Sequence, residues 1–319
     1  VDEIRGEVSF DHKFVPDFVL VRADGSPLYT LAVAVDDILM KVTHVLRGED
    51  LLSSTPRQIR VYQAMGVKPE DYPVFAHLPF VMGQDNAKLS KRNGEVSIAW
   101  YREQGYLPEA ICNYLALLGW SPGDDRENIT MKELCELFTV EKVHSSPARF
   151  DMKKLEAING DKIRALTPDE FLKWSLPFLT KAGIITGTDS EIALVKAALP
   201  IIQERIVKIN EVPQMLKFLF VKEFAVEADS VSKITDDVSK DVLKRSLKEL
   251  EPLTTWNHDS IEAALRACLI EEMGLKPRIA FGAVRIATTG STISPPLFES
   301  MELLGKEASL ARIAAALTL

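Results

Sequence analysis

The chain has 319 residues, of which 46% are hydrophobic and 26% charged, and its formal net charge is −8. It is therefore long enough for two or three domains, and its negative charge argues against a protein that coats nucleic acid without specificity. A shaped RNA partner needs only a local basic face and is not excluded. No apolar run of about 18 residues occurs, so the sequence predicts no membrane span. Without a signal-like apolar segment, we expect a cytoplasmic location.

The first 35 residues are expected to form β structure. Residues 17–22 and 28–35 have the pattern of two strands joined by an Asp24-Gly25 turn. The Asp36-Asp37 pair is predicted to cap a short helix that follows.

The next segment alternates between strand and helix. A buried strand is predicted over residues 43–48, a helix over 57–65 and a further strand over 72–82. This alternation is typical of a parallel α/β sheet, which binds ligands beyond the carboxyl ends of its strands. Arg47 and Asp50 lie at one such end.

The sequence that follows is helical in pattern. The predicted helices cover residues 97–104, 107–118, 130–138, 151–158, 167–182, 189–203, 211–224, 238–253, 259–273, 276–287 and 295–317. Expected N-caps are Thr130, Thr167, Asp189, Asp259 and Ser294. The pair Asn159-Gly160 is expected to end the helix before it.

Three cysteines, Cys112, Cys135 and Cys268, lie far apart in sequence among apolar helical residues. Because no C-x-x-C pair occurs, neither a disulfide framework nor a zinc site is indicated. We expect three buried free thiols and no protein-bound zinc.

Most of the chemically reactive side chains that stand close together lie in Lys88-Leu89-Ser90-Lys91-Arg92, after the strand predicted over residues 72–82. Lys88 and Lys91 are three residues apart, which fits one side of a tight loop. Such a loop can place two ammonium groups around a polyphosphate. Alone, the pattern also fits a solvated basic turn.

Other candidate side chains each have a plain structural alternative. Arg47 could hold a substrate carboxylate, or it could belong to a surface salt-bridge cluster. Tyr29 fits a half-buried aromatic residue at the rim of a sheet. His44 has the pattern of a satisfied core histidine, and His77 of a structural residue. No His/Cys cluster has metal-ligand spacing.

Ordered blocks of the chain resemble bacterial glutamyl-tRNA synthetase, a class I aminoacyl-tRNA synthetase. The blocks are residues 27–32, 36–40, 43–56, 88–92, 106–110, 113–120, 280–282, 289–290 and 294–305. The set spans essentially the whole chain and is specific in its order, although K-x-S-K-R alone is shared across class I synthetases.

The resemblance implies a multi-domain protein with a partial class I Rossmann-like half and helical domains after it. Residues 1–27 would end an acceptor-binding insertion, and 28–83 would be the second half of the catalytic domain. Residues 84–160 would form a mostly α stem-contact domain. Residues 161–319 would form an all-α anticodon-binding region, with a sub-boundary near 227–239.

The resemblance also implies residue roles. The glutamate site would comprise Tyr29, Thr30, Leu31, Ala32, Val33 and Arg47. The ATP site would comprise Asp50, Val81, Lys88, Leu89, Ser90, Lys91 and Arg92. Catalysis would fall to Lys88, Ser90 and Lys91, with Lys91 stabilising charge on the leaving pyrophosphate. ATP and Mg²⁺ would be the cofactors, tRNA-Glu and L-glutamate the partners, and the protein a monomer. Arg205 is nominated for tRNA contact.

Two departures from the family pattern matter. None of the five histidines lies in the family's His-x-Gly-His motif, so the match covers about the C-terminal two-thirds of an enzyme. We therefore expect glutamate–tRNA ligase activity in the parent and none in this polypeptide alone. Val33 stands where many relatives carry Asn.

Other functions remain possible for the chain, both within the synthetase class and outside it. A non-catalytic tRNA-binding fragment is the main one. Glutaminyl-tRNA synthetase has a β-barrel anticodon region, which the helical pattern disfavours, and a glutamyl-queuosine paralogue would lack an anticodon domain.

Overall fold

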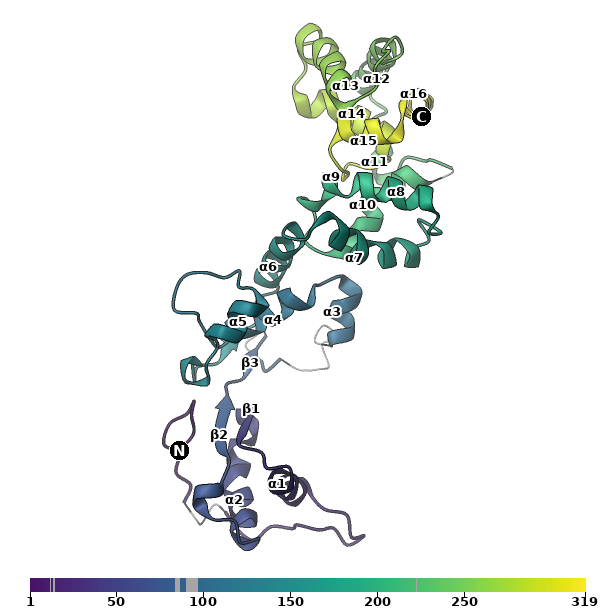
Figure 1. Ribbon diagram of the computed structural model, residues 1–319. Coiled ribbons are helices and arrows are strands. Elements are labelled where there is room, and N and C mark those ends of the chain that lie inside the picture. The colour runs from purple at the N-terminus through teal and green to yellow at the C-terminus, as the bar shows by residue number, and fades with distance from the viewer. Residues whose placement is uncertain (12, 14, 84–86, 90–96, 222) are drawn as a thin grey trace. The chain divides into compact units, whose positions relative to one another are not determined.

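The computed structural model describes residues 1–11, 13, 15–83, 87–89, 97–221 and 223–319. The chain divides into two compact units (Figure 1). The first unit is Val1–Tyr101 with Pro108–Ile158, and the second unit is Arg102–Leu107 with Asn159–Leu319. Ser90, Lys91 and Arg92 of the predicted phosphate loop lie outside the described residues.

A parallel strand pair forms the centre of the predicted α/β segment. Strand β1 (His44–Gly48) pairs with β2 (Val74–Leu78), and helix α2 (Thr55–Ala64) connects them (Figure 1). The predicted strand–helix–strand alternation is confirmed. The strand expected over residues 72–82 is interrupted at Pro79, which has no N–H to donate. Beyond it, β3 (Val81–Met82) pairs in parallel with β4 (Ala148–Arg149).

Helix α1 (Tyr29–Leu39) replaces the strand and short helix that we predicted for this stretch. Leu31, Ala34 and Ile38 lie on one helical face and pack in the cluster that contains the buried Tyr62 of α2. Burial of this face outweighs the apolar run that suggested a strand. The predicted cap is also wrong, because Asp36 and Asp37 lie inside the helix and the N-cap is Leu28.

The remaining β predictions for the first 48 residues are partly wrong. The turn forms, with Arg22 N donating to Ser26 O (2.8 Å), but residues 17–22 contribute only an isolated bridge at Val21. Strand β1 alternates between exposed and half-buried residues, so it is not the buried strand that we expected. His44 is exposed rather than a core histidine.

Short helices complete the first unit. The predictions are confirmed for α4 (Pro108–Leu117) and α5 (Met131–Leu137), and α3 (Ile98–Gln104) also forms as expected. Thr130 caps α5, since its hydroxyl accepts from Glu133 N (3.2 Å). Cys112 and Cys135 are exposed on these helices, and Cys268 alone of the three is buried, so the prediction of three buried thiols is wrong.

Helix α6 (Met152–Arg164) runs through the Asn159-Gly160 pair that was expected to end its first half. Gly160 lacks the positive φ that a C-terminal stop uses. Asn159 is fully buried, and its side chain accepts from Leu107 N (2.8 Å) and donates to Val207 O (2.6 Å). These bonds satisfy the amide inside the second unit without breaking the helix.

The second unit is helical, as predicted. Its helices after α6 are α7 (Pro168–Lys181), α8 (Asp189–Ala198), α9 (Pro200–Gln203), α10 (Val212–Phe220), α11 (Ala228–Val231), α12 (Asp237–Leu250), α13 (His258–Leu265), α14 (Pro277–Thr289), α15 (Leu297–Leu304) and α16 (Lys306–Ala316). A π-helical turn, Arg266–Glu272, continues α13. Pro200 and Gly305 split two helices that the sequence pattern joined.

The N-cap predictions in this unit have mixed outcomes. Thr167 caps α7 as expected, with Glu170 completing a capping box. The caps of α8, α13 and α15 fall instead at Thr188, Asn257 and Pro296.

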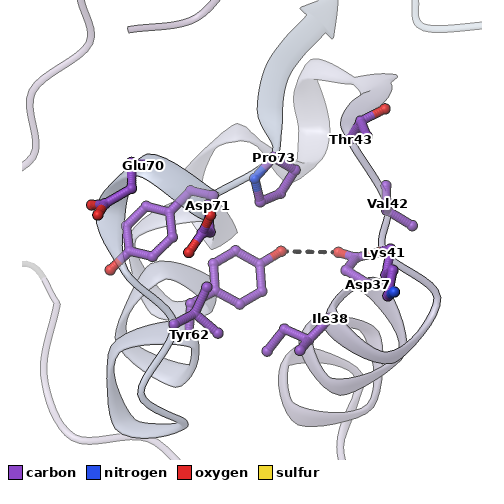
Figure 2. Close-up of a pocket in the computed structure, with 11 residues that line it drawn as sticks. Asp37, Ile38, Lys41, Val42, Thr43, Tyr62, Glu70, Asp71 and Pro73 are labelled. Carbon is purple, nitrogen blue, oxygen red and sulfur yellow. Dashed lines mark hydrogen bonds between the residues drawn. The ribbon is translucent and has the colours of Figure 1, made fainter.

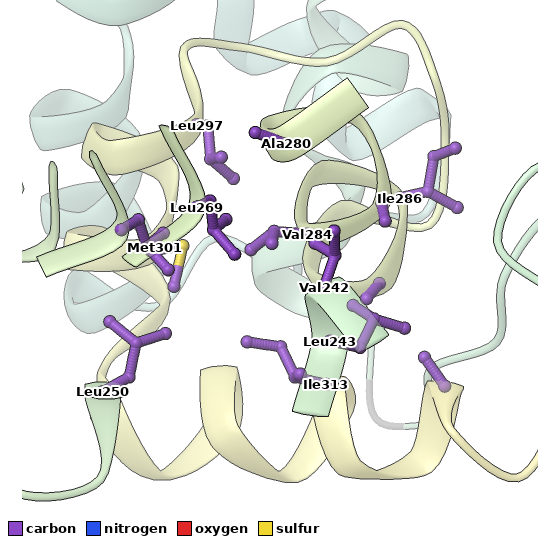
Figure 3. Packing of buried hydrophobic residues seen from close by; sticks show 14 of the residues in the cluster. Val242, Leu243, Leu250, Leu269, Ala280, Val284, Ile286, Leu297, Met301 and Ile313 are labelled. Atoms are coloured by element: carbon purple, nitrogen blue, oxygen red, sulfur yellow. The ribbon is translucent and has the colours of Figure 1, made fainter. Parts of the chain in front are cut away.

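A single apolar cluster holds the C-terminal helices together. Figure 3 shows side chains of α12, α14 and α16, among them Val242, Val284 and Ile313, pointing toward one another. All three are fully buried. This cluster gives the C-terminal part of the second unit its own core.

Candidate active site

Arg47 lies at the carboxyl end of β1 and is fixed by several partners. Its Nε donates to His77 Nε2 (3.0 Å), and its Nη2 donates to Thr55 Oγ1 (2.9 Å) and Leu51 O (3.3 Å). The guanidinium also lies 5.7 Å from the centre of the Phe75 ring. Its Nη1 is buried and has no hydrogen-bond partner among the described residues. A guanidinium held in this way has donors left for a carboxylate.

Tyr62 of α2 bonds to helix α1, the helix that carries Tyr29. It is fully buried, and its hydroxyl donates to Asp37 Oδ2 (3.0 Å). Burial and the hydrogen bond to Asp37 raise the pKa of Tyr62, while the charge of Arg47 opposes the rise.

The predicted glutamate residues from Tyr29 to Val33 occupy the first turns of α1. Tyr29 is 51% exposed. Leu31 packs against the core cluster of the first unit, which gives it a structural contact. The segment thus offers Tyr29 as its polar exposed side chain.

The ATP residues that the structure describes come together. Lys88 Nζ lies 3.4 Å from Asp50 Oδ2 and 4.2 Å from the centre of the Phe80 ring. Leu89 N donates to Val81 O (2.9 Å), which ties the start of the loop to β3. An ammonium and a carboxylate group therefore meet just beyond β1 and β3, at the strand ends where parallel sheets bind ligands.

Gly48 keeps this corner open. A Cβ atom on Gly48 would lie 2.5 Å from Asp50 Oδ1, closer than real Cβ atoms approach an oxygen. A larger residue at this position would therefore displace the exposed Asp50 carboxylate, whereas the backbone of Gly48 is extended and suits any residue.

Sequence reasoning missed the contribution of the first residues. Asp2 Oδ2 lies 2.5 Å from Nδ1 of the buried His77, and Arg5 forms an ion pair with Glu49. Glu49 Oε1 in turn accepts from Phe80 N (2.9 Å). Asp2 and His77 are 75 residues apart, so no local pattern of residue types could have joined them.

The hollow in Figure 2 is separate from this site. It has a volume of about 440 Å³ and is lined by Asp37, Thr43, Tyr62 and Pro73, among others. Thr43 and Pro73 precede β1 and β2, so the hollow lies at the amino ends of the strands. Parallel sheets bind ligands at the opposite end.

Two arginines converge in the second unit. Arg205 is exposed, and Arg285 donates to Pro295 O (2.7 Å) and Ser294 Oγ (3.0 Å). Burial and the charge of Arg205 lower the pKa of Arg285, so the two cations lie near each other. The carboxylate of Glu299 acts on Arg285 as well, so the group holds two cations and one anion.

The described residues contain neither a candidate metal-binding group nor a candidate membrane-spanning helix. No group of three or more His, Cys, Asp or Glu side chains there could hold a metal ion. None of the described helices has the length and apolar character that crossing a membrane requires.

Two family models match consecutive parts of the chain. Residues 1–157 match the catalytic domain of tRNA synthetases class I (E and Q), and residues 170–317 match an anticodon binding domain. The chain thus combines the catalytic-domain fold of class I tRNA synthetases with a helical anticodon binding domain.

Curated relatives narrow the family further. A glutamate–tRNA ligase from Saccharopolyspora erythraea is 49% identical over 321 residues, which cover 99% of this chain and 64% of the relative. A glutamate–tRNA ligase from Nocardioides sp. is 50% identical over 323 residues, covering 99% and 66%. The chain belongs to the glutamate–tRNA ligase family. It spans slightly less than two-thirds of the length of these relatives.

A solved structure agrees with this assignment. The crystal structure of a glutamate tRNA ligase from Elizabethkingia meningosepticum, in complex with its amino acid, superposes with a TM-score of 0.81 at 29% identity. The match covers 99% of this chain and 65% of that one. The fold class predicted from the sequence is confirmed.

Proposed function

We propose that the protein to which this chain belongs ligates L-glutamate to tRNA-Glu in an ATP-dependent reaction through glutamyl-adenylate. The observation that carries the proposal is the half-buried Arg47 at a strand end, whose buried Nη1 is unpaired among the described residues. The family membership of both halves supports the same reaction.

The glutamate site would use charge pairing. Arg47 would bind a carboxylate of the amino acid through Nη1, with Tyr29 at the rim of the site. Val33 would contribute only apolar contact.

The ATP site would act by positioning and electrostatics. The glutamate α-carboxylate attacks the α-phosphate, the bond to the β-phosphate breaks, and pyrophosphate leaves with its electron pair. Lys88, beside Asp50, would contact the polyphosphate. Ser90, Lys91 and Arg92 would extend this contact, and Mg²⁺ would enter with ATP as part of the substrate.

The second unit would bind the tRNA. A helical region matched by an anticodon-binding model carries the exposed Arg205 near Arg285. Such a cationic group can contact the RNA backbone although the whole chain is acidic.

Calorimetric titration of the full chain with L-glutamate tests the amino-acid site. We expect binding that Arg47→Ala weakens by about tenfold or more, because a charge-assisted hydrogen bond contributes about 1.5–3 kcal/mol. The control is Arg22→Ala, which removes an exposed arginine whose side chain bonds only to Ser26 Oγ among the contacts found for it. Equal affinity of wild type and Arg47→Ala would contradict the role given to Arg47.

A non-catalytic tRNA-binding module is the second candidate, favoured by the basic pair in the second unit. It predicts tRNA binding with no response to L-glutamate. The same titration therefore separates the two functions.

A further inference from the structure

Arg47 is oriented by a chain of hydrogen bonds that starts at the second residue. His77 accepts the Arg47 Nε–H at 3.0 Å, and Asp2 lies on the other side of the imidazole ring at 2.5 Å. Both Asp2 and His77 are buried, with 5% and 0% of their surface exposed. No solvent competes for these bonds.

The geometry defines which ring nitrogen of His77 carries the proton. An arginine Nε–H can only donate, so His77 Nε2 must offer its lone pair to Arg47. The proton of the neutral ring then lies on Nδ1 and is donated to Asp2 Oδ2. A doubly protonated ring would have no acceptor left for Arg47.

Asp2 is itself held as an oriented carboxylate. Its Oδ1 accepts from Arg5 N (2.9 Å), Ile4 N (3.1 Å) and His77 N (3.2 Å). Burial works to raise the pKa of Asp2, but the hydrogen bonds from the His77 ring and these N–H groups outweigh it and leave the pKa lowered. Only Oδ2 is therefore free to face the ring.

We propose that Asp2 and His77 are positioning residues for the Arg47 guanidinium, fixing the direction in which its unpaired Nη1 presents to the substrate carboxylate. The proposal rests on the proposed glutamate site for its function. The bonds from Nη2 to Thr55 and Leu51 fix one edge of the guanidinium, and the bond to His77 fixes Nε. With both held, Nη1 has one orientation.

A purely structural role of Asp2 would have different consequences. In that case Asp2 would only fasten residues 2–5 to the end of β2, together with the Arg5 Nε bond to His77 O (3.2 Å). Its loss would lower stability without changing the state of the His77 ring or of Arg47. The experiment must therefore report on those two groups.

The first test is nitrogen-15 NMR of the full chain, which contains five histidines. The wild type should show His77 protonated on Nδ1 and an Arg47 Nε–H signal protected from exchange. In Asp2→Asn, the three backbone N–H groups keep the amide oxygen, so the amide NH₂ faces the ring. We expect the ring proton to move to Nε2 and the Arg47 signal to lose its protection.

The matched control is Asp17→Asn, an exposed aspartate of the same unit. It should leave both signals as in the wild type. An unchanged His77 tautomer and Arg47 signal in Asp2→Asn would overturn the proposal.

The second test compares His77→Gln with His77→Leu and does not depend on Asp2→Asn folding. Glutamine can donate to Asp2 and accept from Arg47 through one amide, whereas leucine fills the space and does neither. Glutamate affinity should stay within about threefold for His77→Gln and fall about 10- to 100-fold for His77→Leu, the usual effect of losing an orienting partner. Equal losses in both variants would overturn the proposal.

Failure of the proposed function would look different. If the wild-type chain does not bind L-glutamate, the glutamate site is wrong as proposed. The tautomer of His77 and the protection of Arg47 Nε–H still decide whether Asp2 and His77 position the guanidinium.

Discussion

At the residue scale, Arg47 owes its proposed role to side chains that are distant in sequence. Its position after an apolar strand was visible in the sequence, and so were Asp50 and Lys88 after predicted strands. The contacts that orient it come from Thr55 and His77, eight and 30 residues away, and could not be predicted from local pattern. Strand ends thus indicated where the proposed site lies, whereas its geometry required the tertiary structure.

A second residue-scale pair makes the second unit sensitive to pH. His258 Nδ1 lies 2.7 Å from Glu302 Oε2. The hydrogen bond with Glu302 and the charge of Asp259 raise the pKa of His258, and hydrogen bonds from His258 lower the pKa of Glu302. A histidine whose pKa is raised in the folded state stabilises the fold at pH values below its pKa in the unfolded state. This stabilisation is lost as the pH rises through its pKa in the folded state.

The pH range in which this pair should stabilise the fold follows from the ordinary pKa values, 6.5 for histidine and 4.5 for glutamate. His258→Gln should lower the melting temperature most between these pH values. Above this pH range the difference in melting temperature between the variant and the wild type should shrink, because His258 loses its proton. Below the range it should shrink because Glu302 takes up a proton. Melting curves from pH 4 to 9 check this, with His144→Gln, an exposed histidine of the first unit, as control. A pH-independent difference would contradict the pair.

At the element scale, helices were predictable where periodicity and caps agreed. Thr130 and Thr167 begin α5 and α7 with capping boxes that the sequence shows. Helix α1 was missed because its apolar residues also fit a strand, and only packing against α2 decides between the two. Helix lengths were overestimated where a single residue, such as Gly305, breaks a continuous apolar pattern.

Gly305 supplies a prediction at this scale. Its φ of 87° and ψ of 158°, between α15 and α16, belong to a region that is essentially restricted to glycine. We expect Gly305→Ala to lower the free energy of unfolding by about 1–3 kcal/mol. Urea unfolding of the full chain, followed by circular dichroism, measures this change.

The matched control is Gly282→Ala in α14. A Cβ there would meet no atom within 4 Å, and the residue is not among the glycines with positive φ. Alanine should raise stability by about 0.5–1 kcal/mol, because glycine inside a helix costs that much. Destabilisation of both variants to the same extent would refute the argument from backbone conformation.

At the scale of the whole molecule, the chain consists of two compact units, for which we propose separate tasks. The first unit presents the strand ends with Arg47, Asp50 and Lys88, and the second is a helical unit matched by an anticodon-binding model. The change from strand–helix alternation to continuous helical periodicity was visible in the sequence. The roles of single residues in binding RNA were not, because an exposed cation on a helix has the same pattern whether it contacts water or phosphate.

The most direct measurement is a gel shift of the full chain with a tRNA-Glu transcript at fixed salt concentration. We expect the chain to shift the transcript. A transcript with a substituted anticodon should bind about tenfold or more weakly, a loss of about 1.4 kcal/mol or more in binding free energy. Arg205→Ala should weaken binding of the intact transcript, whereas Arg22→Ala in the first unit should not. A chain that shifts neither transcript, or both equally, would contradict the assignment of the second unit to tRNA recognition.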